Sequence, residues 1–271
     1  MITITEKEFK LLAEYIQVNY GIQLKSEKQA LLIGRLHNVL IEMGFSSFTQ
    51  YYQYLVTDKN GDAVTILLDK ITTNHTFFMR EAEHFYFFRD YVLPQLARTI
   101  RDRDLRVWCA ASSTGEEPYT LAMIINEFTD KVKLNWDTKI LATDIASNVL
   151  ELAKQGIYSN EKLAPLPKYW KLKYFKKYDN ENSIINEQLK DEVIYRRFNL
   201  MENVFPFKKK FHVIFCRNVM IYFDNHTKDV LVQKLYDMLE NGGYLFIGHS
   251  ESLNRETSPF KYISPAVYRK I

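Results

Sequence analysis

Cysteine is scarce in this chain of 271 residues, and the patterns of a secreted or membrane protein are missing. Its two cysteines, Cys109 and Cys216, are too few for a disulfide framework, so we expect buried free thiols in a reducing compartment. The first ten residues lack the apolar stretch of a signal peptide, and no apolar run approaches the roughly 18 residues that cross a bilayer. We therefore expect a cytoplasmic protein with no segment inserted in a membrane.

A strong charge of one sign is missing as well. The 36 basic and 33 acidic residues give a net charge of only +3, which argues against a nucleic-acid partner. The lysines at 208–210 are typical of a solvated loop. No cluster of cysteines and histidines has the spacing of zinc ligands, so we expect no metal.

The N-terminal region carries the capping signals that mark the ends of helices. Thr5 and Glu8 form a capping box before an apolar face of helical period, and Gly21 can end that helix in a left-handed conformation. Ser26 and Gln29 repeat the capping pattern at the start of a second helix. Further helices are expected at 47–56, 62–71 and 81–98.

The pattern changes after residue 99, where short apolar runs alternate with helical segments. This alternation predicts an α/β fold with a doubly wound sheet. We expect its strands at 105–111, 139–143, 211–216 and 244–248, with a final edge strand at 266–270. A helix over 227–240 should end where Gly242 and Gly243 break it. Residues 157–198 do not keep the alternation, and within them about 160–192 reads as an insertion with some β content.

A loop of small residues follows the first predicted strand, at 111–115, and two carboxylates follow that loop. Ligands of open α/β sheets bind beyond the carboxyl ends of the strands. Glu116 and Glu117 would repel a phosphate there, but they suit a ligand with cationic groups such as S-adenosylmethionine. Alternatively, they only complement the dipole of the helix that begins there. Spacing alone leaves the two readings open.

Asp144 ends the second predicted strand. A carboxylate at this place can accept hydrogen bonds from both hydroxyls of a ribose. It can also act as the N-cap of the next helix. Because Asp144 follows Glu117 by a distance close to that of a β–α–β unit, the ribose role is modestly favoured.

Two further segments could carry chemistry. At 72–81, polar and aromatic side chains alternate at a domain junction, where Arg80 could clamp a carboxylate or simply pair with Glu81 or Glu83. At 215–224, Asn218 and Tyr222 follow a strand that should neighbour the first one. Their alternative role is core packing beside an aspartate cap.

Together these segments resemble the chemotaxis receptor glutamate O-methyltransferase family, often called the CheR type. The resemblance covers nearly the whole chain, in the family's order and spacing. The matching stretches are TTNHTFFMRE at 72–81, WCAASSTGEEPYTLAM at 108–123, ATDI at 142–145, FNL at 198–200, FCRNVMIYFD at 215–224 and GGYLFIGHSESL at 242–253.

This resemblance implies a domain plan. A helical domain would span 1–72, a linker and connecting helix 73–98, and a Rossmann-like methyltransferase domain 99–271. A small β-subdomain would be inserted in the last of these, at about 157–198.

The resemblance also implies a site that binds S-adenosylmethionine without a metal and releases S-adenosylhomocysteine. Arg80 and Tyr222 match positions linked with the chemistry, and Glu117 is preferred to Glu116. Ala146 departs from relatives that carry an acidic residue or a serine there, which removes an accessory polar contact. Nine positions match cofactor contacts: Asn74, Thr76, Arg80, Glu117, Asp144, Asn199, Leu200, Asn218 and Val219.

The implied substrates are glutamate side chains on the long, acidic cytoplasmic helices of chemotaxis receptors. The helical domain should then present basic side chains, and Lys25, Lys28 and Arg35 fall within an arc of about 80° at helical spacing. Leu32 and Val39 share that arc, so basic stems at the edge of a core face explain the pattern equally well.

Two alternatives differ in class from a receptor methyltransferase. One is a non-catalytic sensor or scaffold that binds S-adenosylmethionine, and the other is a methyltransferase for a small molecule or RNA. The low net charge argues against RNA, and the presence of Arg80, Asp144, Asn218 and Tyr222 argues against the sensor. We expect a monomer.

Overall fold

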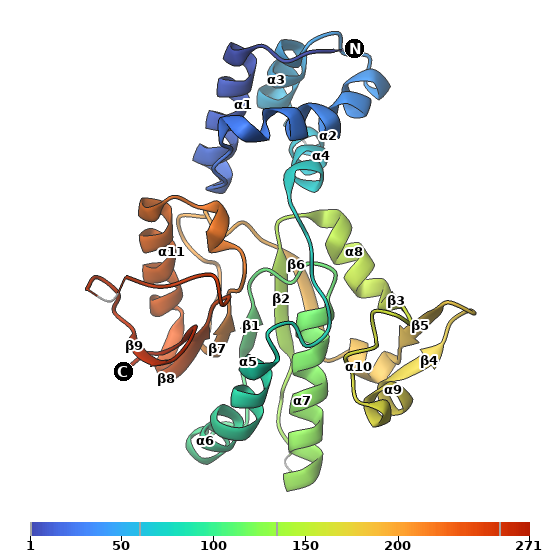
Figure 1. The fold of residues 1–271 in the computed structure, drawn as a ribbon. Helices are drawn as coiled ribbons and strands as arrows, with labels where there is room; N and C mark the ends of the chain where they lie inside the picture. Colours follow the sequence, from blue (N-terminus) through green and yellow to red (C-terminus); the bar gives the residue numbers. More distant parts are fainter. Residues whose placement is uncertain (1, 60, 134, 255) are drawn as a thin grey trace.

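A computed structural model describes residues 2–59, 61–133, 135–254 and 256–271. A helical bundle stands above the carboxyl ends of a mixed sheet, and a small second sheet lies to one side (Figure 1). The bundle consists of α1 (Glu6–Tyr20), the 3-10 turn η1 (Ser26–Lys28), α2 (Gln29–Glu42), α3 (Phe48–Thr57) and α4 (Asp62–Ile71). Its core is apolar and includes Leu12, Ile16, Leu36 and Leu67.

The caps of the bundle follow local sequence signals with one exception. The capping box of Thr5 and Glu8 is confirmed, and Gly21 ends α1 in the left-handed conformation with φ 70°. The prediction of a second capping box is wrong. Ser26 lies inside η1, and α2 begins only at Gln29, without a side-chain cap. A 3-10 turn therefore replaces the expected first turn of α2.

An extended segment leads from α4 down to the second body of the molecule (Figure 1). There the chain forms one continuous helical stretch, made of α5 (Ala82–Phe87), the π-helical η2 (Phe88–Val92) and α6 (Leu93–Thr99). The helix predicted at 81–98 is thus present, with a wider turn in its middle.

The main sheet has seven strands in the order β6-β2-β1-β7-β8-β10-β9. Its bounds are β1 (Val107–Cys109), β2 (Ile140–Asp144), β6 (Val193–Arg197), β7 (Phe211–Phe215), β8 (Leu239–Phe246), β9 (Lys261–Ser264) and β10 (Val267–Arg269). The first five strands in that order are parallel, and β10 and β9 are antiparallel additions. Strand order reverses between β1 and β7, which is where ligands bind in open α/β sheets. The predicted α/β fold class is confirmed.

Two strand predictions need correction. The strand expected at 266–270 is not the edge, because β10 lies between β8 and β9. The strand expected at 244–248 begins five residues earlier, since β8 runs through both Gly242 and Gly243. Gly242 has φ 82°, and the pairing with β7 shifts register before Val213, so these glycines bend a strand instead of ending a helix.

Both faces of the sheet are covered by helices and loops. Side chains alternate along β1, so that Val107 and Cys109 join the core under α5, α6 and α7 (Glu116–Val132), whereas Trp108 points to the opposite core. That opposite core contains α11 (Asn225–Asp237) and phenylalanines from 198–211 that surround the indole. Helix α8 (Ser147–Gln155) packs beside β2 and β6.

The second sheet has three antiparallel strands in the order β3-β5-β4. This small subdomain comprises β3 (Ile157–Ser159), α9 (Lys168–Tyr174), β4 (Phe175–Lys177), β5 (Asn182–Ile185) and α10 (Glu187–Lys190). The next strand, β6, pairs in parallel with β2 in the main sheet. The stretch predicted to be inserted, 157–198, was therefore too long at its C-terminal end.

Both cysteines are buried and free. Within the described ranges, no helix is long and apolar enough to cross a membrane.

Candidate active site

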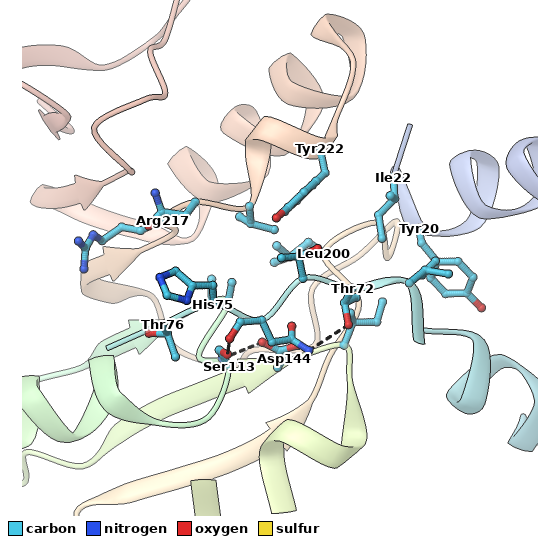
Figure 2. A pocket seen from close by; sticks show the side chains of 18 of the residues that line it. Tyr20, Ile22, Thr72, His75, Thr76, Ser113, Asp144, Leu200, Arg217 and Tyr222 are labelled. Atoms are coloured by element: carbon cyan, nitrogen blue, oxygen red, sulfur yellow. Dashed lines mark hydrogen bonds between the residues drawn. The ribbon is translucent and has the colours of Figure 1, made fainter. Parts of the chain in front are cut away.

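The principal cavity lies between the helical bundle and the carboxyl ends of β1, β2 and β7 (Figure 2). Its empty space is about 1340 Å³ when solvent at the mouth is included. All of the cofactor contacts predicted from the sequence line it, as does Tyr222. The structure thus brings together residues from 74 to 222 that the sequence places on five separate segments.

Asp144 stands at the end of β2 and is almost fully buried. Its two oxygens accept hydrogen bonds from the backbone N–H groups of Ser113 (2.8 Å) and Ala146 (3.0 Å). Ala146, not Asp144, is the N-cap of α8, so the capping alternative does not describe this carboxylate. Burial raises the pKa of Asp144. A carboxylate has about four acceptor sites, which leaves capacity for two hydroxyl donors from a ligand.

The loop between β1 and α7 approaches the small subdomain very closely. A Cβ atom on Gly115, where φ is 95°, would lie 2.8 Å from the hydroxyl oxygens of both Tyr158 and Tyr195. The Tyr158 hydroxyl also donates to the carbonyl of Thr114 at 2.7 Å. Only glycine therefore fits at position 115, and the subdomain supports the loop that borders the cavity.

The two adjacent glutamates at the start of α7 point in different directions. Glu116 is fully buried away from the cavity, where it pairs with Lys162 of the subdomain at 2.9 Å. Glu117 lines the cavity and accepts a hydrogen bond from the Cys109 thiol. This geometry supports the choice of Glu117 over Glu116 as a ligand contact.

A buried arginine, Arg217, ties the walls of the cavity together. Its guanidinium forms ion pairs with Glu117 and with Glu81 (3.0 Å), and it donates to the backbone carbonyl of Arg80. Although burial opposes the charge of Glu81, Arg217 and Asn218 hold the pKa of that carboxyl below its usual value. This role of Arg217 is not predictable from the sequence, because its partners lie 100 or more residues away.

Beside this network, Glu81, His84 and His249 place potential metal-ligand atoms within 4.8 Å of one another. Burial lowers the pKa of His84 to about 4. Glu81 is already bonded to Arg217, to the Asn218 amide (3.1 Å) and to the backbone N–H of His249 (3.1 Å). We therefore assign Glu81 to the Arg217 network.

The junction segment forms one wall of the cavity. The Arg80 guanidinium donates to the carbonyl of His75 at 2.7 Å, and Glu81, a partner considered for it, pairs with Arg217. The backbone carbonyl of Asn74 accepts a hydrogen bond from the Ser113 hydroxyl at 2.9 Å. This contact joins the junction to the loop after β1, beside Asp144 (Figure 2).

The loop after β7 carries Asn218 and Tyr222 and is held by a second, half-buried carboxylate. Glu251 accepts backbone hydrogen bonds from Gly248 (2.6 Å), Asn218 (2.9 Å) and Ile221 (3.2 Å). Burial raises the pKa of Glu251. Asn218 has φ 57°, and the 3-10 turn η3 (Met220–Tyr222) follows it. In this arrangement the Tyr222 side chain points into the cavity, opposite Asp144 (Figure 2).

Asn199 and Leu200 border the cavity after β6. The Asn199 amide nitrogen donates to the carbonyl of Asn19 at 2.9 Å, and its oxygen accepts from the N–H of Met201. The amide is thus engaged within the protein. One N–H donor and one oxygen lone pair of this amide remain for a ligand.

The three basic residues predicted to dock substrate differ in their surroundings. Lys25 is exposed and does not border the cavity, whereas Lys28 and Arg35 do. Arg35 donates to the carbonyls of Lys70, Ile71 and Thr72 at the end of α4, so it fastens the domain junction. The Lys28 ammonium lies 5.5 Å from the centre of the Tyr222 ring, at the mouth of the cavity.

A parallel-centred sheet, an acidic side chain ending its second strand and a cavity at its switch point fit a Rossmann-like, S-adenosylmethionine-dependent methyltransferase. Comparisons with known families agree. Residues 74–268 match the model described as "CheR methyltransferase, SAM binding domain", and residues 7–72 match "CheR methyltransferase, all-alpha domain". The chain belongs to the CheR methyltransferase family.

Curated relatives match over nearly their whole length. A "Chemotaxis protein methyltransferase" of Borreliella burgdorferi is 42% identical over 99% of this chain and 96% of its own. A "Chemotaxis protein methyltransferase 2" of Pseudomonas aeruginosa is 34% identical over 97% and 93%. The Escherichia coli "Chemotaxis protein methyltransferase" is 32% identical over 98% and 92%.

Proposed function

We propose that this protein transfers the methyl group of S-adenosylmethionine to glutamate side chains of chemotaxis receptors, releasing S-adenosylhomocysteine. The observation that carries the proposal is the cavity at the sheet's switch point, where the polar side chains expected to hold such a cofactor converge. The full-length relation to chemotaxis protein methyltransferases supports the choice of receptors as substrates.

The residues around the cavity suit a cationic thioether nucleoside. Asp144 retains acceptor capacity for ribose hydroxyls, and Glu117 supplies negative charge near the start of α7. The carboxyl group of the ligand would find Arg80 within the same wall. We assign the remaining contacts, as predictions from the family pattern, to Asn74, Thr76, Asn199, Leu200, Asn218 and Val219.

The transfer needs alignment more than it needs a base. A glutamate side chain has a pKa near 4.3 and is ionised at neutral pH, so its oxygen can attack without losing a proton. When bound, S-adenosylmethionine supplies a methyl group on a positively charged sulfur. Because the reacting charges neutralise each other, a cavity that excludes water favours the reaction. Accordingly, we propose that Tyr222 and Arg80 position the reacting groups and that no metal takes part.

Replacing Tyr222 by Phe should lower kcat about tenfold and leave the Kd for S-adenosylhomocysteine within about threefold, because only the orienting hydroxyl is lost. Initial-rate kinetics and calorimetry measure the two quantities. Tyr178→Phe is the matched control, since Tyr178 is exposed on the small subdomain and does not line the cavity. Weaker cofactor binding with an unchanged kcat would show that Tyr222 has no positioning role.

Lys28 is the best placed of the three basic residues to attract an acidic receptor helix, because it lies at the mouth beside Tyr222. Lys28→Glu should weaken binding of a receptor cytoplasmic fragment about tenfold at low salt, and the difference should shrink in high salt. Lys7→Glu makes the same charge change on the exposed surface of α1. Equal losses in both variants would mean that only net charge matters.

A radiolabelled methyl-transfer assay with receptor cytoplasmic fragments tests the proposed function directly. Base-labile label on receptor glutamates is the expected result. We propose in addition that the protein works as a monomer in the cytoplasm. Cofactor binding without any transfer would instead favour a sensor. Transfer only to RNA or to a small molecule would favour a different substrate.

A further inference from the structure

The C-terminal end of α1 is bonded to the loop that carries Tyr222, although about 200 residues separate them in the chain. The backbone N–H of Gln23 donates to the carbonyl of Tyr222 at 2.8 Å. The amide nitrogen of Gln17 donates to the Asp224 carboxylate at 2.9 Å. These two hydrogen bonds bracket the residues 222–224 on both sides.

Between the two bonds, Gly21 allows the chains to approach unusually closely. It is buried, and its φ of 70° ends α1. A Cβ atom at this position would lie 2.6 Å from the sulfur of Met201, 3.0 Å from a methyl carbon of Thr227 and 3.2 Å from the ring of Phe223. A side chain on residue 21 would therefore force Met201 to shift and would crowd Phe223, and it would strain the left-handed backbone at this position.

We define residues 17–23 together with residues 222–224 as the α1 clasp. On one side of it, Tyr20 and Ile22 line the cavity; on the other, Tyr222 and Phe223 do so. Figure 2 shows Ile22 and Tyr222 entering the cavity from these two sides. A displacement of the end of α1 would thus move the tyrosine that faces Asp144.

We propose that Gly21 and Gln17 are positioning residues for methyl transfer, because the α1 clasp they form fixes Tyr222 over the cavity. The helical domain is then part of the active site as well as a docking domain. This inference rests on the proposed function, since it assigns a role in that same reaction.

Gly21→Ala tests the proposal, and the chain offers a matched control in Gly44→Ala. Gly44 also follows a helix and has φ 74°, but a Cβ atom there would meet nothing within 4 Å. Both variants carry the same backbone strain, and only Gly21→Ala opens the α1 clasp. We expect Gly21→Ala to lower kcat about tenfold with KM for S-adenosylmethionine changed less than threefold, and Gly44→Ala to stay within about twofold of the parent chain. Equal kinetics in the two variants would overturn the proposal.

Gln17 and Asp224 provide a second test that does not strain the backbone. Gln17→Glu sets two carboxylates against each other and should lower kcat. Adding Asp224→Asn should restore it, because asparagine can donate to Glu at 17 and is as good an N-cap for α11 as aspartate. A double variant as slow as Gln17→Glu alone would contradict a positioning role.

Hydrogen–deuterium exchange separates the clasp from the proposed function. Peptides covering 217–224 should exchange faster in Gly21→Ala than in Gly44→Ala, whether or not receptor fragments are methylated. Faster exchange with no transfer by the parent chain would leave the clasp standing and reject the receptor substrate. If the parent chain does methylate receptor fragments but these peptides exchange equally fast in Gly21→Ala and Gly44→Ala, the clasp alone is rejected.

Discussion

Asp144→Ala should raise the Kd for S-adenosylhomocysteine about 100-fold while the chain remains folded. The carboxylate is proposed to accept both ribose hydroxyls, and hydrogen bonds to a charged group contribute about 1.5–3 kcal/mol each. Two such bonds at the low end of this range amount to about 3 kcal/mol, which corresponds to roughly two powers of ten in Kd. Calorimetric titration measures the affinity, and circular dichroism verifies the fold.

The control for this variant is a neighbouring carboxylate outside the cavity. Asp69 lies close enough to Asp144 to influence its pKa, but it does not line the cavity. Asp69→Asn should therefore leave the Kd within about threefold, since it changes the local charge and no ligand contact. If both variants bind the ligand equally well, Asp144 does not hold the ribose.

The same carboxylate predicts a pH dependence. Because burial raises the pKa of Asp144, its proton is taken up at a higher pH than for an ordinary aspartate. The protonated form accepts fewer hydrogen bonds, so affinity for the ligand should fall as the pH is lowered through the raised pKa. Asp144→Ala should remove this part of the pH profile.

Arg217→Met should lower the free energy of unfolding by about 3–5 kcal/mol, because it leaves two largely buried carboxylates without their cation. Glu81 and Glu117 would then repel each other beside the cavity, and ligand binding should weaken as well. Urea denaturation monitored by tryptophan fluorescence measures the loss.

An exposed ion pair gives the comparison for Arg217. Arg89 pairs with Asp90 on the surface, where both side chains are about half exposed. Arg89→Met should therefore cost less than about 1 kcal/mol. The double variant Arg217→Met/Glu81→Gln should recover part of the lost stability. Similar losses in the free energy of unfolding for Arg217→Met and Arg89→Met would show that the buried network stabilises the fold no more than an exposed ion pair does.

The sequence was sufficient where a structural feature depends on nearby residues. Thr5 and Gly21 were assigned correctly as caps, because each satisfies groups within one turn of its own helix. The apolar runs that became β1, β2 and β7 were found because buried parallel strands are nearly continuous in hydrophobicity. β9 was missed because it is a largely exposed edge strand with a lysine and a serine at its ends.

In the candidate site, too, some features could be predicted from the sequence and others depend on tertiary contacts. Asp144 and Asn218 were predicted because they stand near strand ends, where a fold pattern predicts convergence, whereas Asn74, Thr76 and Val219 came only from the resemblance to the family. Arg217 and Glu251 were not found, because their partners are fixed only by tertiary contacts. Nor could helical spacing separate Lys28, at the cavity mouth, from Arg35, which binds the carbonyls that end α4. The α1 clasp depends on hydrogen bonds from Gln17 to Asp224 and from Gln23 to Tyr222, which spacing does not reveal.

Calorimetric titration of the purified, folded full chain with S-adenosylhomocysteine tests the account most directly. We predict saturable heat with one ligand per chain, competed by S-adenosylmethionine. A correctly folded chain that gives no heat with either compound would contradict the proposal that this cavity binds the methyl donor.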